Sequence, residues 1–569
     1  MMAPSATLDR IRTNTTEIRR QRKAMQRAQT EISLYQNIPG EVGLRRRGNI
    51  SVLDIKKRQF KRRNLQSSPG YITIPARHYL AKWIVSIPND PEQCKNVVIR
   101  VDRYGGAWRW TGLMHHWTLE TIDGVDYVTA FFNDDLQFLQ FLLCPPNPLL
   151  PIPIFQFPRD LLMFISTRWG ASALAWMNVV RQETNAFTLP DDPFDFSSYT
   201  DSLDTRTWQV HVKCPSLPND SSLWGVFASR MNNIESVIAD PLDDAQITPT
   251  YRRIFTDEGE TVDGLINNDI ANGALVFEFV DRSGFASSDG TYSTGNAVAG
   301  LARTVTTWTE DLMDTVLGFI DDDESLTPDE YWQSGFLGTK AKKPAVCIRD
   351  SWYNDLKSKV SYSPASATQV IVGGDNPAAD ALAQTIISSV GNLLGYFFLF
   401  GFDSAGTIAA DLIMPFLVGT IAAWDQFELG ARATNLGWVH LWEILQSGAE
   451  QNAWSLSAVA AARGGVKDTG DETSHTMVID QSTWVIPGLH YDIGDRISSS
   501  SGALQRMGID LLFVAQVEEM TESGDDTGNS EFVTVVGKNK AAMSRAERDA
   551  RSLKKAMDRI ADIGVHLIS

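Results

Sequence analysis

The residue types that carry out chemistry in proteins are present in this chain, but their spacing matches no catalytic signature. The patterns HExxH, GxSxG, GxxxxGK and GxGxxG are absent from the 569 residues. The sequence therefore contains no motif for a metalloprotease, a nucleophilic hydrolase or a nucleotide-binding site. The neighbouring carboxylates Asp134 and Asp135 have the residue types of a glycosidase acid pair. Among 69 acidic residues, however, such a pair is expected by chance. We assign no catalytic residue.

Metal-ligand spacing is equally weak. The eight histidines are scattered, and the only adjacent pair is His115-His116. Because neighbouring side chains of a β-strand point to opposite faces, this pair is expected on a strand surface rather than around one ion. The acidic run Asp321–Glu324 lacks EF-hand ligand spacing and is interpreted as a solvated loop, with calcium binding as the minority alternative. No metal and no cofactor is predicted.

The cysteines and the first residues bear on the folding compartment. Cys94, Cys144, Cys214 and Cys347 lie far apart and form no Cys-x-x-Cys pair, a pattern that favours buried thiols over a disulfide framework or a zinc site. The opening residues lack the apolar core of a secretory signal. We therefore expect folding in a reducing cytoplasm.

The charge of the chain is unevenly distributed. The net charge is −18, yet residues 1–63 hold 16 Lys and Arg against 5 Asp and Glu. Such a basic arm could bind nucleic acid, but we favour docking on an acidic neighbouring subunit, which needs only charge complementarity. The arm residues that we expect to dock are Arg45, Arg46, Arg47, Lys56, Lys57, Arg58, Lys61, Arg62 and Arg63.

Length, composition and patterning indicate an α+β protein of several domains. A 43% hydrophobic and 21% charged composition is typical of globular proteins, and domains of about 100–200 residues give roughly three or four of them. The polar stretch 7–36 is expected to be helical only with a partner, because it has no broad apolar face. Residues 37–66 are expected to form a linker. From about residue 71, four strands and the Asp123-Gly124 turn predict an antiparallel meander.

Beyond the meander the chain becomes mixed. A proline-rich crossing segment precedes residues 159–181, whose apolar spacing predicts a helix, and residues 207–214 and 273–281 are expected to be strands. Residues 427–448 are expected to be helical. From residue 475 strands return as a second all-β unit, and the capping box at Ser544 predicts a C-terminal helix.

The most unusual composition lies at residues 381–424. Residues 381–402 hold no charge, and a second uncharged run covers 412–424. The first run has the length of a bilayer span, about 20 residues, but polar side chains dilute it and no clear basic flank follows. We favour a buried helical hairpin or oligomer interface over a conditional membrane or channel-plug role and a permanent span. Its candidate interface residues are Leu393, Leu394, Tyr396, Phe397, Phe398, Phe400, Phe402, Phe416 and Trp424.

Three stretches in order along the chain resemble minor tail proteins, or tail hubs, of mycobacteriophage-like actinobacterial siphophages. They are the strand and turn ending in Val280-Asp281-Arg282-Ser283-Gly284, the strand ending in Val372-Gly373-Gly374, and PGLHYDIGDRIS at residues 487–498. The opening meander with WTGLMHHW is similar to the first barrel of that family. The resemblance covers about residues 70–540, and the segment 1–66 is less typical of the family.

The resemblance implies a virion protein of the tail tip, assembled in the host cytoplasm. Hubs of this kind are homotrimers in which each chain carries two similar small β-barrels, so that three chains present a pseudo-sixfold ring to the tail tube. The implied partners are the distal tail protein, the tape measure protein and other minor tail proteins, with transient passage of phage DNA and possible host envelope contact. A tail-tip cell-wall hydrolase and a membrane-active injection protein are the alternative functions.

The expected fold therefore combines two antiparallel β-barrel hub domains with an α/β middle region, an apolar helical hairpin and terminal helices. The corresponding boundaries are 1–66 for the basic arm and linker, 67–155 for the first barrel, 156–360 for the middle region, 361–450 for the apolar hairpin region, 451–541 for the second barrel and 542–569 for the C-terminal helix.

Overall fold

The computed structural model describes most of the chain outside its apolar and C-terminal segments. The described ranges are 4–150, 161–184, 203–282, 346–349, 357–373, 424–446, 468–479, 485–509, 511–527 and 530–537, with a few shorter pieces between them. The apolar residues 393–416 and the C-terminal helix predicted over 542–569 lie outside these ranges.

The N-terminal part forms a helix and an antiparallel sheet. Its elements are α1 (Pro4–Arg27), β1 (Glu31–Gln36), β2 (Arg45–Ile50), β3 (Lys57–Arg63), β4 (Pro69–Pro75), α2 (Tyr79–Ser86), β5 (Val97–Arg103), β6 (Trp108–Ile122) and β7 (Val125–Asp134). The Asp123-Gly124 turn joins β6 to β7 with both residues at positive φ, 50° and 77°, as a tight hairpin requires. The predicted meander holds for β5, β6 and β7, whereas β4 pairs with β7 and β3 and not with β5.

The structure corrects the expectation of a linker over 37–66. Strands β2 and β3 fall within this stretch, and β3 pairs with β4 on one side and with β23 (Leu511–Asp525) on the other. The strand alternates exposed or half-buried residues with the buried Arg58, Phe60 and Arg62, a period-2 pattern that basic composition conceals because two of the inward residues are arginines.

The second β unit continues the same sheet. Its strands are β17 (Ser358–Ser363), β21 (Glu472–Ile479), β22 (Arg496–Ser500), β23 and β24 (Ser530–Val536). The strand order β17-β21-β24-β23-β3-β4-β7-β6-β5-β1-β2 has two free ends and does not close among the described strands. The α+β class is therefore confirmed, while the two separate barrels stay a prediction.

One hydrophobic core unites the two β units. It brings Phe60, Trp108 and Trp110 of the first unit together with Val517 and Phe532 of the second, all of them almost completely buried. Trp108 meets Phe532 edge to face, with ring centroids 5.4 Å apart, a preferred aromatic geometry. Segments more than 400 residues apart thus form a single packed body.

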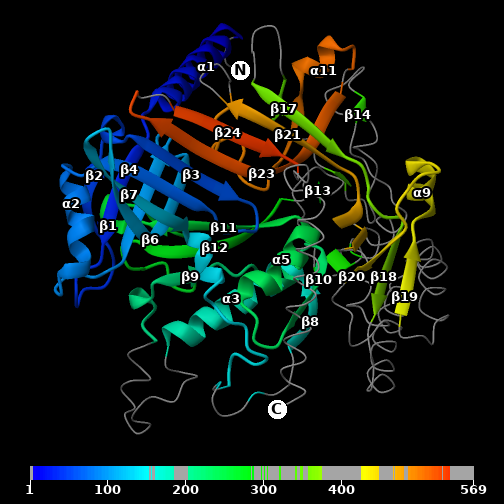
Figure 1. Ribbon diagram of the computed structural model, residues 1–569, viewed down its shortest axis with the longest axis horizontal. Helices are drawn as coiled ribbons and strands as arrows, with labels where there is room; N and C mark the ends of the chain where they lie inside the picture. The colour runs from blue at the N-terminus through cyan, green and yellow to red at the C-terminus, as the bar shows by residue number, and fades with distance from the viewer. Residues whose placement is uncertain are drawn as a thin grey trace.

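The middle region packs two helices against short sheets. Its elements are β8 (Leu161–Ser166), α3 (Thr167–Glu183), β9 (Val210–Val212), β10 (Trp224–Ser229), α5 (Ile234–Ala245), β11 (Ile247–Ile254) and β12 (Ala274–Asp281). Helices α3 and α5 share a second core with β9, β11 and β12 and lie below them in the view of Figure 1. The strands predicted at 207–214 and 273–281 are confirmed by β9 and β12.

Two predicted helices are shorter than expected. Residues 161–166 form β8, paired with β10, because a short apolar run fits a strand as well as a helix turn. In the described part of 427–448, residues 427–446, only α9 (Gly430–Leu436) is helical; Gly437, at φ 84°, ends it. Strands β19 (Trp424–Glu428) and β20 (Glu443–Gln446) flank α9 and pair with β18 (Gln369–Gly373) in a small sheet at the right of Figure 1.

Candidate functional site: charged interfaces

Five of the nine predicted docking residues form ion pairs with the second β unit of the same chain; they are Lys56, Arg58, Lys61, Arg62 and Arg63. The basic strand β3 lies beside the acidic strand β23. Lys61 and Arg63 both pair with Glu519, at 2.8 and 3.2 Å, and Lys56 pairs with Asp526 at 2.9 Å. These cations therefore lie along the junction of β3 and β23, which we call the seam. The sequence had instead predicted that they contact a neighbouring subunit.

The centre of the seam is a buried cluster around Glu522. The Glu522 carboxylate lies 3.2 Å from Arg58 Nη2 and 3.1 Å from Arg103 Nη1, and Thr30 Oγ1 and Ser530 Oγ donate hydrogen bonds to it. The side chains of Arg58 and Glu522 have no exposed surface. A buried ion pair is strongly destabilised when one partner is removed, because an uncompensated charge remains. Loss of either partner is therefore expected to weaken the joint between β3 and β23.

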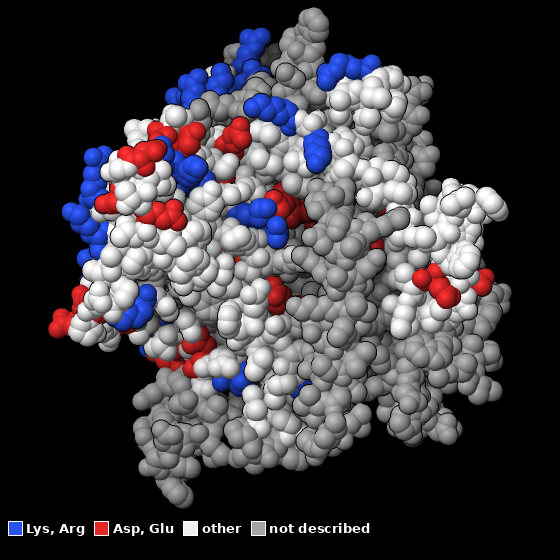
Figure 2. Space-filling view, viewed as in Figure 1, with Lys and Arg blue, Asp and Glu red and all other residues white. Residues whose placement is uncertain are grey.

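Arg45, Arg46 and Arg47 lie on β2, which is an end strand of the sheet. Arg45 pairs with Glu41 at 2.8 Å in an exposed position, and the Arg47 guanidinium lies over the Trp83 ring at 5.5 Å. Figure 2 shows blue side chains along this edge and over α1, with acidic groups nearby. Arg45 on this edge and the cations of α1 are the more exposed parts of the basic arm.

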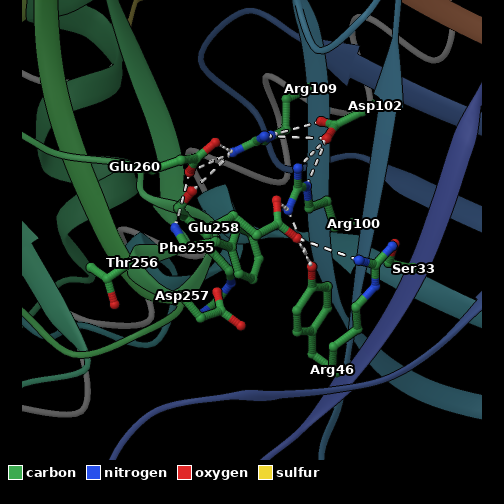
Figure 3. Close-up of polar contacts among 12 residues, drawn as sticks. Ser33, Arg46, Arg100, Asp102, Arg109, Phe255, Thr256, Asp257, Glu258 and Glu260 are labelled. Carbon is green, nitrogen blue, oxygen red and sulfur yellow. Dashed lines mark hydrogen bonds and ion pairs between the residues drawn. The ribbon is translucent and has the colours of Figure 1, made fainter.

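A second charged interface joins β5 and β6 to the turn after β11 (Figure 3). Arg109 lies 2.7 Å from Asp102 and 2.8 Å from Glu260, so it bridges the sheet and the middle region. Burial raises the pKa of Glu260, but the Phe255 N–H and Arg109 outweigh this effect and the net shift is downward. The carboxylate is thus held in its charged form.

Arg100 makes the parallel connection. It lies 2.6 Å from Asp102 and 2.6 Å from Glu258 of the 3₁₀ turn Thr256–Glu258, and its guanidinium lies 4.6 Å from the centre of the Phe255 ring. Burial disfavours the charged guanidinium, yet the two carboxylates raise the pKa of Arg100 overall. Arg46 also approaches Glu258, at 3.6 Å. We call the group Arg46, Arg100, Asp102, Arg109, Glu258 and Glu260 the clasp.

A buried carboxyl lies where the sheet, the middle region and the second β unit meet. Asp134 has no exposed surface. Burial raises the pKa of Asp134 to about 7, while the nearby polar groups of Ser67 and Ser68 oppose the rise. Nearby, Arg62 lies over the Tyr251 ring at 5.2 Å and pairs with Asp492 at 3.2 Å. The pair Asp134-Asp135 is thus not an exposed acid pair, since Asp135 is held by Arg253 at 2.7 Å.

His115 and His116 lie exposed on strand β6, as predicted, but their side chains do not point to opposite faces. The register of β6 against β7 shifts between Met114 and His116, and such a bulge turns neighbouring side chains toward the same side. The two rings meet with Nδ1 atoms 2.9 Å apart, and His116 stacks on Phe131 at 4.3 Å. Both histidines are exposed. In the described part of the chain no group of three or more His, Cys, Asp or Glu has metal-binding geometry.

Of the apolar candidates, Leu393, Leu394, Tyr396, Phe397, Phe398, Phe400, Phe402 and Phe416 lie outside the described residues, and Trp424 begins β19. None of the helices that the structure describes is long and apolar enough to span a bilayer.

Sequence reasoning missed the pairing of β3 with β23. A signal for it exists as complementary charge, since KRQFKRR at 57–63 meets the acidic stretch that contains Glu518, Glu519 and Glu522. From composition alone, the acidic partner of this basic run is expected on another chain, because the two strands lie more than 450 residues apart in the sequence.

Comparisons with known proteins agree with the resemblance found in the sequence. The chain is 28% identical over 474 residues to minor tail protein Gp28 of Mycobacterium phage L5 and 27% identical over 471 residues to Gp28 of Mycobacterium phage D29. Each alignment covers 74% of this chain and 77% of the relative. The resemblance to minor tail proteins of siphophages is confirmed.

Solved structures give weaker matches. A tail protein from Neisseria meningitidis MC58 aligns over 90% of this chain and 97% of its own, at 9% identity and a TM-score of 0.39. The 43 kDa tail protein of prophage MuSo2 from Shewanella oneidensis aligns over 89% and 98%, at 11% identity and a TM-score of 0.37. The family model of the Siphovirus ReqiPepy6 Gp37-like proteins matches residues 40–538, and the chain therefore belongs to that family.

Proposed function

We propose that the chain is a structural hub of the phage tail tip, which joins the tail tube and distal tail ring to the host-contacting tip. The observation that carries this proposal is the single sheet in which two antiparallel β units lie side by side across β3 and β23. In a homotrimer, such a chain offers six β units to a ring of sixfold tube subunits. Its role is architectural and needs no catalytic group.

Rigidity of the joint supports this role. A hub must keep its two β units in a fixed relation, because a tube subunit contacts each of them. The buried Glu522 cluster and the shared aromatic core fix this relation, while the clasp ties the sheet to the middle region. The partners in this proposal are the distal tail protein, the tape measure protein and other minor tail proteins, with phage DNA passing along a channel that the trimer lines or closes.

The oligomeric state gives the first test. Purified full-length chain, measured by light scattering after size-exclusion chromatography, is expected at three times the monomer mass of 63.1 kDa. It is then expected to bind rings of the distal tail protein in pull-down experiments. A monomer across the micromolar range that also fails to bind those rings contradicts the proposal.

One surface favours the membrane-active alternative. Between α9 and the end of β20, Trp438 is 96% exposed, Val439 81% and Trp442 76%. Exposed aromatic and apolar clusters of this kind mark partner or membrane contacts. Flotation of the chain with neutral lipid vesicles separates the two functions: a hub stays with the protein fraction, whereas a membrane-active protein floats without any trigger.

A further inference from the structure

Helix α1 has little support from its own chain. Met25 packs against the main core, while Ile18 remains 48% exposed. Figure 1 shows the helix at the outer edge of the sheet, near its upper left in that view. Helices of polar sequence are marginal in water without tertiary packing. We therefore expect a partner to contact the exposed side of α1.

The exposed side of α1 is cationic. From residue 12 to its end at Arg27 the helix carries six Lys or Arg and one acidic residue, Glu17, a net charge of +5. Within the described residues, Arg20 is the only one of these cations that forms an ion pair, and its partner is Glu17 at 3.1 Å. A partner for this helix must therefore be acidic and must offer some apolar surface to Ile18.

The tip of the β6–β7 hairpin has the opposite character. Residues 119–126 extend past the end of β4, whose last pair joins Pro75 to Tyr127. The tip contains three acidic residues and no Lys or Arg, and Leu119, Ile122 and Val125 are 54%, 43% and 46% exposed. A two-stranded ribbon with exposed apolar side chains is marginal by itself. Like α1, the tip carries apolar side chains that remain exposed.

The backbone of the tip is well suited to present these groups. Asp123 and Gly124 form the tight turn, and Thr121 Oγ1 donates to the Asp126 carboxylate at 2.6 Å. A rigid surface loses little conformational entropy on binding. Ile18 of α1 and Leu119, Ile122 and Val125 of the tip are all exposed within one chain.

We infer that the hairpin tip of one chain docks on α1 of a second copy of the same chain. The two surfaces complement one another in charge, −3 against +5, and each has apolar side chains to bury. A contact between two different surfaces of identical chains is heterologous and closes into a ring when the rotation permits. This inference rests on the proposed trimeric hub and names its subunit contact.

Charge reversal tests the contact. The tip variant combines E120K, D123K and D126K, and the helix variant combines R19E, R20E and K23E. At low salt each variant is expected to weaken self-association at least tenfold in light scattering and sedimentation, because like charges then face one another. A chain that carries both sets of substitutions is expected to regain the wild-type molar mass. The matched control K82E with E92K reverses two exposed charges elsewhere and is expected to leave association unchanged.

The outcomes separate the contact from the hub proposal. A wild-type trimer that persists in both variants overturns the inference and leaves the trimer standing, whereas a wild-type monomer overturns both. If the tip and helix variants each weaken self-association but the chain with both sets of substitutions does not regain it, the two surfaces do not meet. This result also overturns the inference. Loss of double-stranded DNA binding in the helix variant with unchanged molar mass assigns α1 to DNA instead. Thermal melts that match wild type confirm that the variants fold.

Discussion

Arg58 and Glu522 lie 464 positions apart in the sequence and form an ion pair, 3.2 Å between Nη2 and Oε1, without any exposed side-chain surface. The pair stands at the junction of β3 and β23. It shows that a stretch with the composition of a surface arm is part of the interior.

Replacing Glu522 with Gln is expected to destabilise the protein by about 3–5 kcal/mol, because Arg58 and Arg103 would keep buried charges without a counter-ion. Chemical denaturation followed by tryptophan fluorescence measures the loss. Glu531→Gln is the control, since that residue is 58% exposed and pairs only loosely with Lys357 at 3.8 Å. A loss for Glu522→Gln no larger than that of the control contradicts the stabilising role of the seam.

Gly524 is needed because Arg58 passes directly over it. A Cβ at this position would overlap Nη2 and Cζ of the Arg58 guanidinium, which is buried and cannot move without leaving Glu522. We expect Gly524→Ala to cost about 1–3 kcal/mol. Gly430→Ala is the matched control, because nothing lies within 4 Å of the place that its Cβ would occupy. Equal melting temperatures for the two variants would argue against the close approach.

Asp134 predicts a pH dependence of stability. Its pKa is raised to about 7 in the folded state, against about 4 in the unfolded chain. Between these values the folded protein binds the extra proton, so this residue's contribution to stability falls as pH rises from about 4 to 7. Asp134→Asn is expected to remove a decline on the order of 3 kcal/mol over that range. Melting curves at pH 5 and pH 8 measure it, and an unchanged difference between the two pH values would count against the assignment.

The clasp is expected to show measurable coupling. Arg109 and Glu260 are 7% and 21% exposed and lie 2.8 Å apart, so a double-mutant cycle with alanine is expected to give about 1–3 kcal/mol. The exposed pair Arg206–Asp204, at 2.7 Å, is the control and is expected to give a clearly smaller coupling, because water screens both charges. If both cycles give the same small value, the clasp does not hold the middle region to the sheet.

Local patterns predicted the local parts of this fold. Alternating apolar residues and the Asp123-Gly124 turn indicated β6 and β7, and the strand at 273–281 was also found, because these signals lie within a few residues of each other. The β8 segment was predicted as helix because a short apolar run fits both periodicities.

The charged interfaces depend on contacts that no local pattern encodes. The basic run 57–63 has the same composition whether it faces a neighbour or β23. The meeting of His115 with His116 depends on a shift in strand register, and the burial of Asp134 depends on three parts of the chain coming together. Net charge locates the basic residues, but only the tertiary fold shows which of them pair with β23 inside the chain.

Cryo-electron microscopy of tail tips from virions that carry this chain tests the central claim most directly. A tail-tip hub is expected in three copies around the tail axis, placed between the tube and the host-contacting tip, with the two β units of each copy facing successive tube subunits. Six copies per ring, or a position along the tail away from the tip, would contradict the proposed hub.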